Sequence, residues 1–298
     1  MSFHSYLSLR KLLAWAINLT YGLCLIVLVV ILLQLLFVTS FKIPSDSMEP
    51  ALLTGDYILV DKCSKGARLF NVFAALEKKE VKIHRMPGWR SFKRNDVLVF
   101  NFPYSDRWDS IAFDVMSYYV KRCIAVPGDT LEIRKAHYKV RGCSQSLGNE
   151  KAQDELQEML NQKWIDESDI VLLGYPYDEG LNWTIAEFGP LYIPAKGSTI
   201  EMNPLNWVLY KNLIEWEQKK SLILRGDTIS LGDSIIDRYR FHENYYFVSG
   251  DKIANSKDSR YWGLLPEPFI VGRALRIWKS VDNVSEKVRW ERVWRKIE

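Results

Sequence analysis

The stretch KIPSDSMEP, residues 42–50, lies directly after a long uncharged apolar segment. Residues 12–41 contain no Asp, Glu, Lys or Arg, and residues 21–38 are apolar apart from one glycine and one glutamine. About 20 apolar residues in a helix are enough to cross the hydrocarbon core of a bilayer, so the segment predicts a transmembrane helix over residues 12–41. Two serines, Ser45 and Ser47, are therefore expected where the chain leaves the membrane.

A cleaved secretory signal is the alternative explanation of the apolar segment, and residues 38–40, Val-Thr-Ser, offer small side chains at a cut point. The apolar core of a signal peptide is roughly 7 to 15 residues long, about half of the run in this chain, so an uncleaved anchor is favoured. Two basic residues, Arg10 and Lys11, stand just before the span, and the residues after it carry both signs. This bias predicts a cytoplasmic N-terminus, residues 1–11, and an exported remainder.

The composition narrows the class of function. The net charge of +4 is spread along the chain, which gives nucleic-acid binding little support. The chain has no CxxC or HExxH motif, so we expect no zinc site. Cys24 lies in the span, which leaves Cys63, Cys123 and Cys143 for one possible disulfide, whose pairing the sequence does not decide.

Runs rich in β-branched and aromatic residues dominate the chain after the anchor. They are bounded by Gly, Pro, Asn or Asp, as strands usually are. The predicted strands are Tyr57–Val60, Val97–Phe102, Tyr118–Val126, Tyr245–Val248 and Phe269–Trp278. The sequence therefore predicts a mostly β fold, with an antiparallel sheet or barrel-like core built from residues 42–133 and 226–284.

Residues 134–225, between the two parts of the core, are expected to form an inserted α+β region. Apolar residues recur at helical spacing in Asn149–Trp164 and Pro204–Lys220, which predicts two amphipathic helices. The tail, residues 285–298, also has apolar residues at helical spacing, two of them tryptophans, beside basic ones. That pattern suits a helix on a membrane surface, and docking of the tail onto the domain is an equal alternative.

Ser47 alone is weak evidence for a nucleophile, because most serines in such turns cap or bend the chain. No G-x-S-x-G elbow surrounds it, which disfavours an α/β-hydrolase. Three histidines, His84, His137 and His242, follow the anchor without a recognisable triad motif, and the fourth, His4, precedes the span. A Ser-His-Asp enzyme is therefore disfavoured as well.

Lys121 is the second candidate for chemistry, within the predicted strand Tyr118–Val126. Successive side chains on a strand point to opposite faces, so one of the adjacent cations Lys121 and Arg122 must point at an apolar surface. If Lys121 is the buried one, desolvation lowers its pKa from a reference of about 10.4, and a neutral lysine can take the proton of a serine. The alternative is an edge-strand lysine that reaches water.

Several sequence blocks follow one another in a fixed order after the anchor. The blocks are PSDSMEP at 44–50, Gly55-Asp56, Lys121-Arg122 leading to Pro127-Gly128-Asp129, NSKDSRYWG at 255–263 and VGRA at 271–274. Together with the anchor they resemble bacterial type I signal peptidase, the membrane-anchored Ser-Lys protease that removes signal peptides from exported proteins. Residues 62–94 and 134–225 carry little of this resemblance.

The resemblance implies a role for each matching residue, and it makes the β core the catalytic part of the chain. Ser47 is implied as the acylating nucleophile and Lys121 as the general base. Ser45 falls on the family's serine two residues before the nucleophile, whose hydroxyl joins the Ser47 backbone N–H as the oxyanion hole. Ser256 is implied as the residue that orients the lysine. Asp258 and Arg260 are implied as the supporting ion pair beneath the site.

The resemblance also implies the partners, the location and the substrate pockets. The partners are membrane lipid and exported preproteins with small residues, often alanine, at the first and third positions before the cut. The location is the bacterial inner membrane, with the catalytic domain on the periplasmic side, and no metal or organic cofactor is needed. Residues that match the shallow pockets are Phe41, Ile43, Pro44, Met48, Leu52, Tyr119 and Val120.

One departure from the family pattern stands at residues 252–254, where Lys-Ile-Ala replaces the usual Asn-Arg-Asp. Two alternatives to a general signal peptidase are open. One is a Ser-Lys peptidase with a narrow client set, because the insertion can restrict access, and the other is an inactive anchored binding module. All the residues with implied catalytic and supporting roles are retained, which argues against the inactive module.

Overall fold

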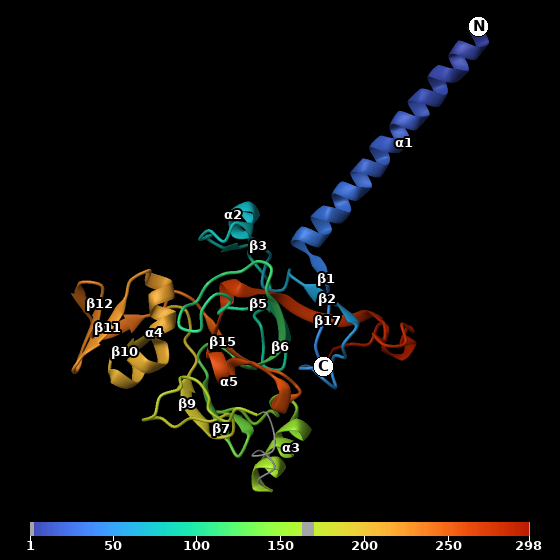
Figure 1. Ribbon diagram of the computed structural model, residues 1–298. Helices are drawn as coiled ribbons and strands as arrows, with labels where there is room; N and C mark the ends of the chain where they lie inside the picture. Colours follow the sequence, from blue (N-terminus) through green and yellow to red (C-terminus); the bar gives the residue numbers. More distant parts are fainter. Residues whose placement is uncertain (1–2, 163–169, 298) are drawn as a thin grey trace.

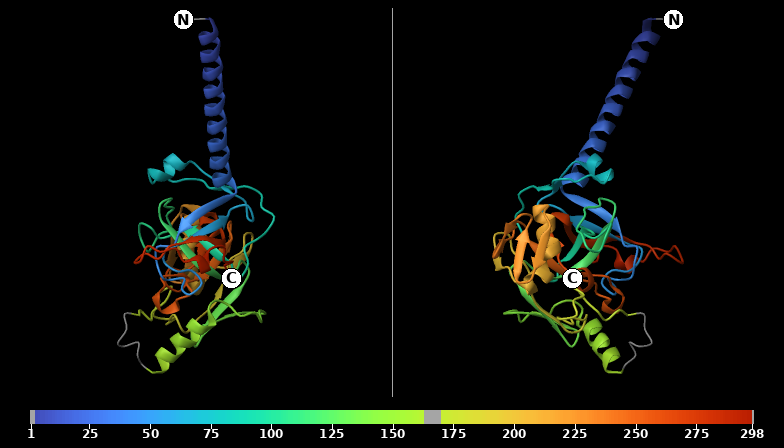
Figure 2. Two further views of the ribbon diagram at one scale, coloured as in Figure 1. Left: turned by 90° about the vertical axis from the view of Figure 1, so that its right-hand side faces the viewer. Right: turned by 60° about the vertical axis from the view of Figure 1, so that its left-hand side comes forward.

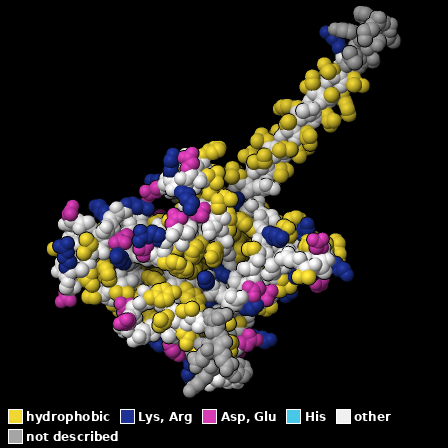
Figure 3. Space-filling model, viewed as in Figure 1, with side chains coloured by type: hydrophobic (Ala, Val, Ile, Leu, Met, Phe, Trp, Pro, Cys, Tyr) yellow, Lys and Arg dark blue, Asp and Glu magenta, His cyan; other side chains and the backbone are white. Residues whose placement is uncertain are grey.

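The computed structural model describes residues 3–162 and 170–297. Helix α1, Phe3–Leu36, projects away from a β-rich domain formed by the rest of the described chain (Figure 1). Its stretch Arg10–Leu36 is long and apolar enough to cross a membrane, and no residue of its most apolar part is buried against the domain (Figure 3). A helix that is apolar all round requires an apolar environment, which agrees with the predicted anchor.

The anchor helix ends at Leu36, before the predicted boundary at Phe41. Strand β1, Val38–Lys42, begins almost at once and pairs antiparallel with β2, Asp56–Asp61. The predicted helix end is wrong because the β-branched and aromatic residues at 38–41 suit a strand as well as a membrane, and β2 supplies the partner. An apolar run does not distinguish the two.

A seven-stranded antiparallel sheet forms the centre of the domain. All five predicted strands belong to it, so the prediction of a mostly β, antiparallel core is confirmed. The sheet is open, because its first and last strands do not pair with each other, and it does not close into a barrel. In spatial order the strands are β1, β2, β17 (Ile270–Ser280), β5 (Val97–Asn101), β6 (Tyr118–Ala125), β15 (Tyr245–Ser249) and β16 (Leu265–Pro266).

Both faces of the central sheet are covered, because β5 is buried along its whole length. Leu98 and Phe100 pack with Trp262 on one face, whereas Val97 and Val99 belong to a second cluster on the other face. Full burial of such a side chain contributes roughly 1.5–3 kcal/mol relative to leaving it exposed. Strands in this position hold their neighbours, β17 and β6, in a fixed register.

The expected insertion appears as small sheets and two helices in two places of the domain (Figure 1 and Figure 2). Helices α3, Glu150–Asn161, and α4, Pro204–Gln218, confirm the two predicted helices, although Trp164 lies outside the described residues. The small sheets begin before residue 134 and continue past residue 225, so the predicted limits fall inside this region. The sheets are β7 (Thr130–Arg134), β8 (His137–Val140) and β9 (Phe188–Tyr192); β10 (Thr199–Glu201) and β14 (Arg238–Arg240); and β11 (Leu222–Arg225), β12 (Thr228–Leu231) and β13 (Ser234–Ile235). Helix α3 and β7–β9 lie at the end of the domain far from α1, and α4 with β10–β12 lies at one side (Figure 1 and Figure 2).

Asparagine caps set the start of both helices in this region. The Asn149 side chain accepts a hydrogen bond from the Ala152 N–H, and the Asn203 side chain accepts one from the Asn206 N–H. Such caps satisfy backbone donors that have no partner inside the helix. The remaining short elements are β3 (Arg68–Leu69), α2 (Val72–Leu76), β4 (His84–Arg85), α5 (Ser259–Trp262) and 3-10 turns at Ile253–Asn255, Glu267–Phe269 and Trp290–Arg292.

The C-terminal tail docks onto the domain and is not an α-helix. Apart from its one 3-10 turn it runs beside β17, where the Trp294 N–H donates to the Ile277 carbonyl oxygen at 2.6 Å. Arg292 is buried, and its Nη2 lies 2.6 Å from Asp56 Oδ2. The expected membrane-surface helix is therefore wrong and the docking alternative is confirmed, because the tail finds backbone and carboxylate partners on the domain.

Replacing Arg292 with Met should destabilise the domain, because the Asp56 carboxylate would stay buried without its counter-ion. Removal of one partner of a buried pair typically costs about 3–5 kcal/mol. We expect a loss of that order in the free energy of unfolding, measured by urea denaturation in detergent. Arg295→Met, at an exposed position of the same tail, is the matched control and should leave stability unchanged. An R292M variant as stable as the wild type would contradict the prediction.

Candidate active site

Ser47 lies in a turn held between β1 and β2. The Ile43 N–H donates to the Asp56 carbonyl oxygen at 2.8 Å, and the Gly55 N–H donates to the Ile43 carbonyl oxygen at 2.9 Å, so the two ends of the turn are tied together. Gly55 has φ +92°, and a Cβ at this position would collide with the Val281 carbonyl oxygen, so the turn requires glycine here. The turn is therefore a fixed support for Ser47.

Lys121 on β6 lies against Ser47. Its Nζ is 2.5 Å from Ser47 Oγ, and the lysine is only 3% exposed. Burial lowers the pKa of Lys121 to about 8, with the Asp258 carboxylate acting to raise it and the Arg260 guanidinium acting to lower it. A lysine with this pKa is partly neutral at pH 7 to 8 and can accept the proton of a serine.

The adjacent cation, Arg122, is buried as well, but it has a carboxylate partner. Its Nε and Nη2 each lie 2.6 Å from one oxygen of Asp251. A bidentate pair of this kind satisfies both charges. Both adjacent cations of β6 are therefore buried. Arg122 is paired with a carboxylate, whereas Lys121 contacts the Ser47 hydroxyl.

Asp258 and Arg260 form a fully buried ion pair beside Lys121. Arg260 Nε lies 2.8 Å from Asp258 Oδ1, and neither side chain is exposed. Asp258 Oδ2 also accepts hydrogen bonds from the Gly250 N–H at 3.0 Å and from Ser249 Oγ at 3.1 Å. Burial acts to raise the pKa of Asp258, but the Arg260 charge and the hydrogen bonds from Arg260 and the Gly250 N–H outweigh it and hold the pKa below its ordinary value.

Ser256 lies next to the Ser47 turn without a hydrogen bond to Lys121. Its Oγ is buried and has no hydrogen-bond partner among the described residues. A Cβ built on Gly250 would lie 2.3 Å from Ser256 Oγ and 2.5 Å from the Ser47 carbonyl oxygen, so only glycine fits between them. The implied contact that orients the lysine is therefore not formed here, although Ser256 is in the immediate surroundings.

The residues matched to substrate pockets lie mostly around the Ser47 turn. Pro44 and Ser45 are exposed beside it, so the Ser45 hydroxyl is accessible. Tyr119 lies on the face of β6 opposite to that of Val120, which by alternation is the face of Lys121, and it stacks on Phe102 with 4.6 Å between ring centroids. The remaining matched residues share one apolar cluster: Phe41, Ile43, Met48, Leu52 and Val120.

Sequence reasoning missed a charged contact between the Ser47 turn and the loop after β15. Lys252 Nζ lies 2.5 Å from Asp46 Oδ2 and 3.5 Å from Glu49 Oε2, and Asn255 donates to Asp46 Oδ2 at 3.1 Å. The Lys252 N–H also donates to the Ser47 carbonyl oxygen at 3.1 Å. The departure at residues 252–254 was the available signal, but a single sequence does not show which distant residue a lysine will meet.

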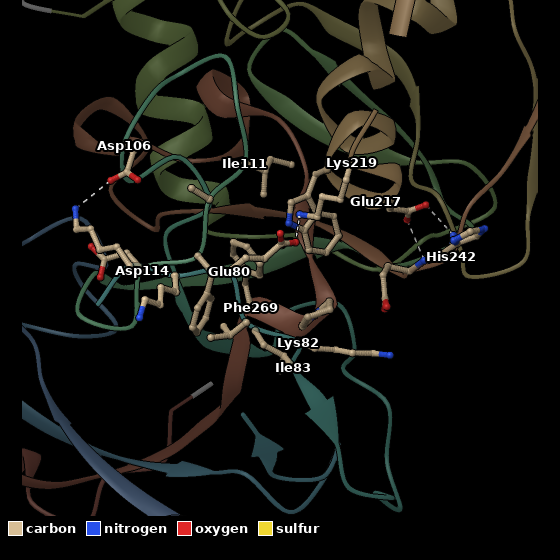
Figure 4. Close-up of a pocket in the computed structure, with 18 residues that line it drawn as sticks. Glu80, Lys82, Ile83, Asp106, Ile111, Asp114, Glu217, Lys219, His242 and Phe269 are labelled. Carbon is tan, nitrogen blue, oxygen red and sulfur yellow. Dashed lines mark hydrogen bonds and ion pairs between the residues drawn. The ribbon is translucent and has the colours of Figure 1, made fainter. Parts of the chain in front are cut away.

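Two cavities lie outside the dyad. One cavity, of about 280 Å³, is lined by Asn255 and Ser256 and by aromatic side chains such as Tyr261. The other, of about 900 Å³, is lined by residues that include Glu80, Lys219 and Phe269 (Figure 4). Neither is lined by Ser47 or Lys121. Among the described residues no group of three or more His, Cys, Asp or Glu side chains could hold a metal ion, and the four cysteines are free thiols.

Comparison with known proteins adds the family to this geometry. Two proteins named signal peptidase I, from Buchnera aphidicola, are similar along most of the chain. The one from subspecies Baizongia pistaciae is 29% identical over 276 residues, or 89% of this chain and 76% of that protein. The one from subspecies Schizaphis graminum is 26% identical over 264 residues, or 86% and 72%.

A solved structure of a signal peptidase I from Enterococcus faecalis V583 aligns with 62% of this chain and 97% of that chain, at 19% identity. Its TM-score of 0.28 is too low to support a conclusion about the fold. The family model described as "Signal peptidase, peptidase S26" matches residues 16–279, a range that includes most of the anchor and every charged and hydroxyl residue of the site. The chain therefore belongs to the signal peptidase family, peptidase S26.

Proposed function

We propose that this chain removes N-terminal signal peptides from exported preproteins, with Ser47 as the nucleophile and Lys121 as the general base. By its family the chain is a serine endopeptidase, and its apolar N-terminal helix makes it a membrane-anchored one. The observation that carries the assignment of residues is the 2.5 Å contact between Ser47 Oγ and Lys121 Nζ. The same contact argues against an inactive module, since binding alone requires no serine hydrogen-bonded to a buried lysine.

The dyad can run both halves of the reaction. Neutral Lys121 accepts the Ser47 proton as Oγ attacks the carbonyl carbon of the scissile bond. When the C–N bond of the tetrahedral intermediate breaks, Lys121 returns the proton to the leaving amine, which becomes the N-terminus of the mature protein. A water molecule, losing a proton to Lys121, then attacks the ester carbonyl carbon. When the bond from that carbon to Ser47 Oγ breaks, Lys121 returns the proton to Oγ, which releases the signal peptide with a C-terminal carboxyl group and restores the dyad.

The oxyanion hole proposed for this site consists of the Ser47 backbone N–H and the Ser45 hydroxyl. Ser45 is exposed two residues before the nucleophile, so its hydroxyl can turn toward a bound carbonyl oxygen. Loss of one such donor typically lowers the rate by roughly 100- to 1,000-fold. Asp258 and Arg260 would act indirectly, by holding the loop that packs under Ser47.

An open strand edge next to Lys121 supports binding of an extended substrate. β15 pairs with β6 at residues 122–125, so within the described ladders Tyr118–Lys121 is paired on one side alone, with β5. A peptide can add to such an edge through backbone hydrogen bonds, with alternate side chains on one face. The apolar cluster around Ile43 would then receive the first and third residues before the cut, which suits small side chains such as alanine.

The proposed setting is the bacterial inner membrane, with the N-terminus in the cytoplasm and the catalytic domain on the periplasmic side. Arg10 and Lys11 before the span support this orientation, because basic residues favour the cytoplasmic side. A preprotein held in the same bilayer by its signal peptide is at a high effective concentration, so weak contacts at the shallow pockets suffice.

Ser47→Ala and Lys121→Met should each lower kcat for a purified preprotein by at least about 1,000-fold, because each removes a partner of the proton transfer. Lys139→Met, at an exposed position of β8, is the matched control for the lysine and should keep full activity. Circular dichroism should show intact folding of all three variants. Full activity of S47A would sink the assignment of the nucleophile.

The pH dependence of kcat/KM should follow Lys121. Protonated lysine cannot act as a base, so activity rises with pH and levels off above the lysine pKa, which burial lowers to about 8. A short peptide substrate in detergent, assayed between pH 5 and 10, separates this limb from changes in membrane binding. A profile that is already level at pH 6 would point to a different base.

Lys252→Met should shift that limb toward higher pH. Without its lysine partner, the Asp46 carboxylate favours the charged form of Lys121 more strongly. The pair is partly exposed and therefore screened, so we expect a shift of less than about one pH unit. Adding Asp46→Asn should reverse the shift, and Lys257→Met, exposed on the same loop, is the control. If the pH dependence of kcat/KM is unchanged in K252M, Lys252 has a structural role alone and does not affect the pKa of Lys121.

A further inference from the structure

A β-hairpin with α2 at its tip lies beside the membrane end of α1. β3 and β4 form the hairpin, with Arg68 opposite Arg85, and α2 stands between them. Figure 1 and both views of Figure 2 place α2 next to the lower end of α1. The hairpin lies within residues 62–94, which contain none of the sequence blocks that carry the family resemblance.

The segment that leads into the hairpin is bound to the last carbonyl groups of α1. Lys62 Nζ lies 2.9 Å from the Gln34 oxygen and 3.3 Å from the Leu35 oxygen, and Cys63 Sγ lies 3.5 Å from the Phe37 oxygen. A cation at this helix end satisfies carbonyls that have no partner inside the helix. The start of the hairpin is thus fixed at the level where α1 leaves the bilayer.

The base of the hairpin is bound to the central sheet by two arginines. Arg68 Nη1 lies 2.9 Å from Asn101 Oδ1 and 3.0 Å from the Phe269 carbonyl oxygen. Arg85 Nη2 lies 2.6 Å from the Ile270 carbonyl oxygen. The position of α2 is therefore set by the domain on one side and by the anchor helix on the other.

The chain that returns from α2 forms one wall of the cavity of about 900 Å³ (Figure 4). Two ion pairs connect it to neighbouring segments, Lys78 with Asp106 at 3.2 Å and Glu80 with Lys219 at 2.9 Å. Both pairs are exposed and individually weak, but they join the return segment to two different parts of the domain. The hairpin is held along its length and not at its base alone.

The tip of this hairpin exposes apolar side chains that the domain does not cover. Phe73 is 78% exposed and Leu76 53%, with Leu69 and Val72 near 45%. Trp89, just after the hairpin, is 76% exposed. Residues 77–80 after α2 are Glu-Lys-Lys-Glu, and Figure 3 shows basic and acidic side chains beside the apolar ones at the top of the domain. Apolar residues, a tryptophan and lysines together are the composition of a segment at a membrane interface.

We propose that Leu69, Val72, Phe73, Leu76 and Trp89 form a second membrane contact, inserted into the interface of the bilayer that α1 crosses. Lipid is the occupant that the geometry favours, because the contacts with Gln34 and Leu35 fix the hairpin at the membrane end of α1. Removing apolar side chains of this size from water favours such a contact. A second contact stops the domain from swivelling about α1, so Ser47 keeps one orientation toward the membrane.

Depth-dependent quenching in vesicles tests this contact directly. The full chain, carrying the fluorescent amino acid Anap at position 73, is reconstituted in phosphatidylcholine–phosphatidylglycerol vesicles with doxyl-labelled lipid. We expect quenching at position 73, stronger from doxyl groups near the headgroups than from groups deep in the chains. Anap at position 235 is the control, because Ile235 is 75% exposed in the β11–β13 sheet, on the side of the domain away from α1 (Figure 1). Equal quenching at both positions would overturn the proposal in favour of water or a protein partner at this surface.

A second measurement rests on the proposed function and uses cleavage as its readout. Phe73→Glu should slow cleavage of a preprotein in the same vesicles several-fold and leave cleavage of a short soluble peptide in detergent unchanged. Ile235→Glu should affect neither. An equal loss on both substrates, or no loss on either, would contradict a membrane role for Phe73. Because the quenching experiment needs no activity, failure of the peptidase assignment would leave its result standing.

Discussion

The burial of Lys121 without a carboxylate of its own is the constraint on which the site depends. Desolvation lowers its pKa only while nearby negative charge is balanced by other cations. Each of the three carboxylates that act on Lys121 is already bound to another basic side chain. The lysine therefore stands among balanced pairs, and its best partner is the hydroxyl of Ser47. The pairs are Asp258–Arg260, Asp251–Arg122 and Asp46–Lys252.

The sheet makes this arrangement stable enough to persist. Lys121 and Ser47 are 74 residues apart in the sequence. They come into contact because the Ser47 turn follows β1 directly and because β6, which carries Lys121, pairs with both β5 and β15. Gly250 completes the junction, since its missing side chain lets the loop after β15 pack directly on the Ser47 carbonyl. Burying the charged side chains of the site is unfavourable. The packing of the two apolar clusters on the faces of the sheet offsets this cost in free energy.

Much of the fold could be predicted from local patterns, because β-branched runs and helical spacing report on single elements. The five central strands, α3 and α4 follow from such patterns. The end of α1 and the position of the tail do not follow from such patterns. Residues 38–41 suit a strand as well as a membrane helix, and the burial of Arg292 in the tail depends on its ion pair with Asp56, which is distant in the sequence. In the site, Ser47 and Lys121 were predicted through the family resemblance. The Asp46–Lys252 contact was not, because it depends on pairing between distant loops.

The direct passage from α1 into β1, with Phe37 alone between Leu36 and Val38, has a mechanical consequence. A stretch of 27 residues, Arg10–Leu36, is about 40 Å long as a helix, whereas the hydrocarbon core is about 30 Å thick, so the helix must tilt to match it. No flexible linker absorbs that tilt. A change in bilayer thickness is therefore transmitted from α1 to the whole domain, and the proposed membrane contact of the hairpin would oppose the rotation that results.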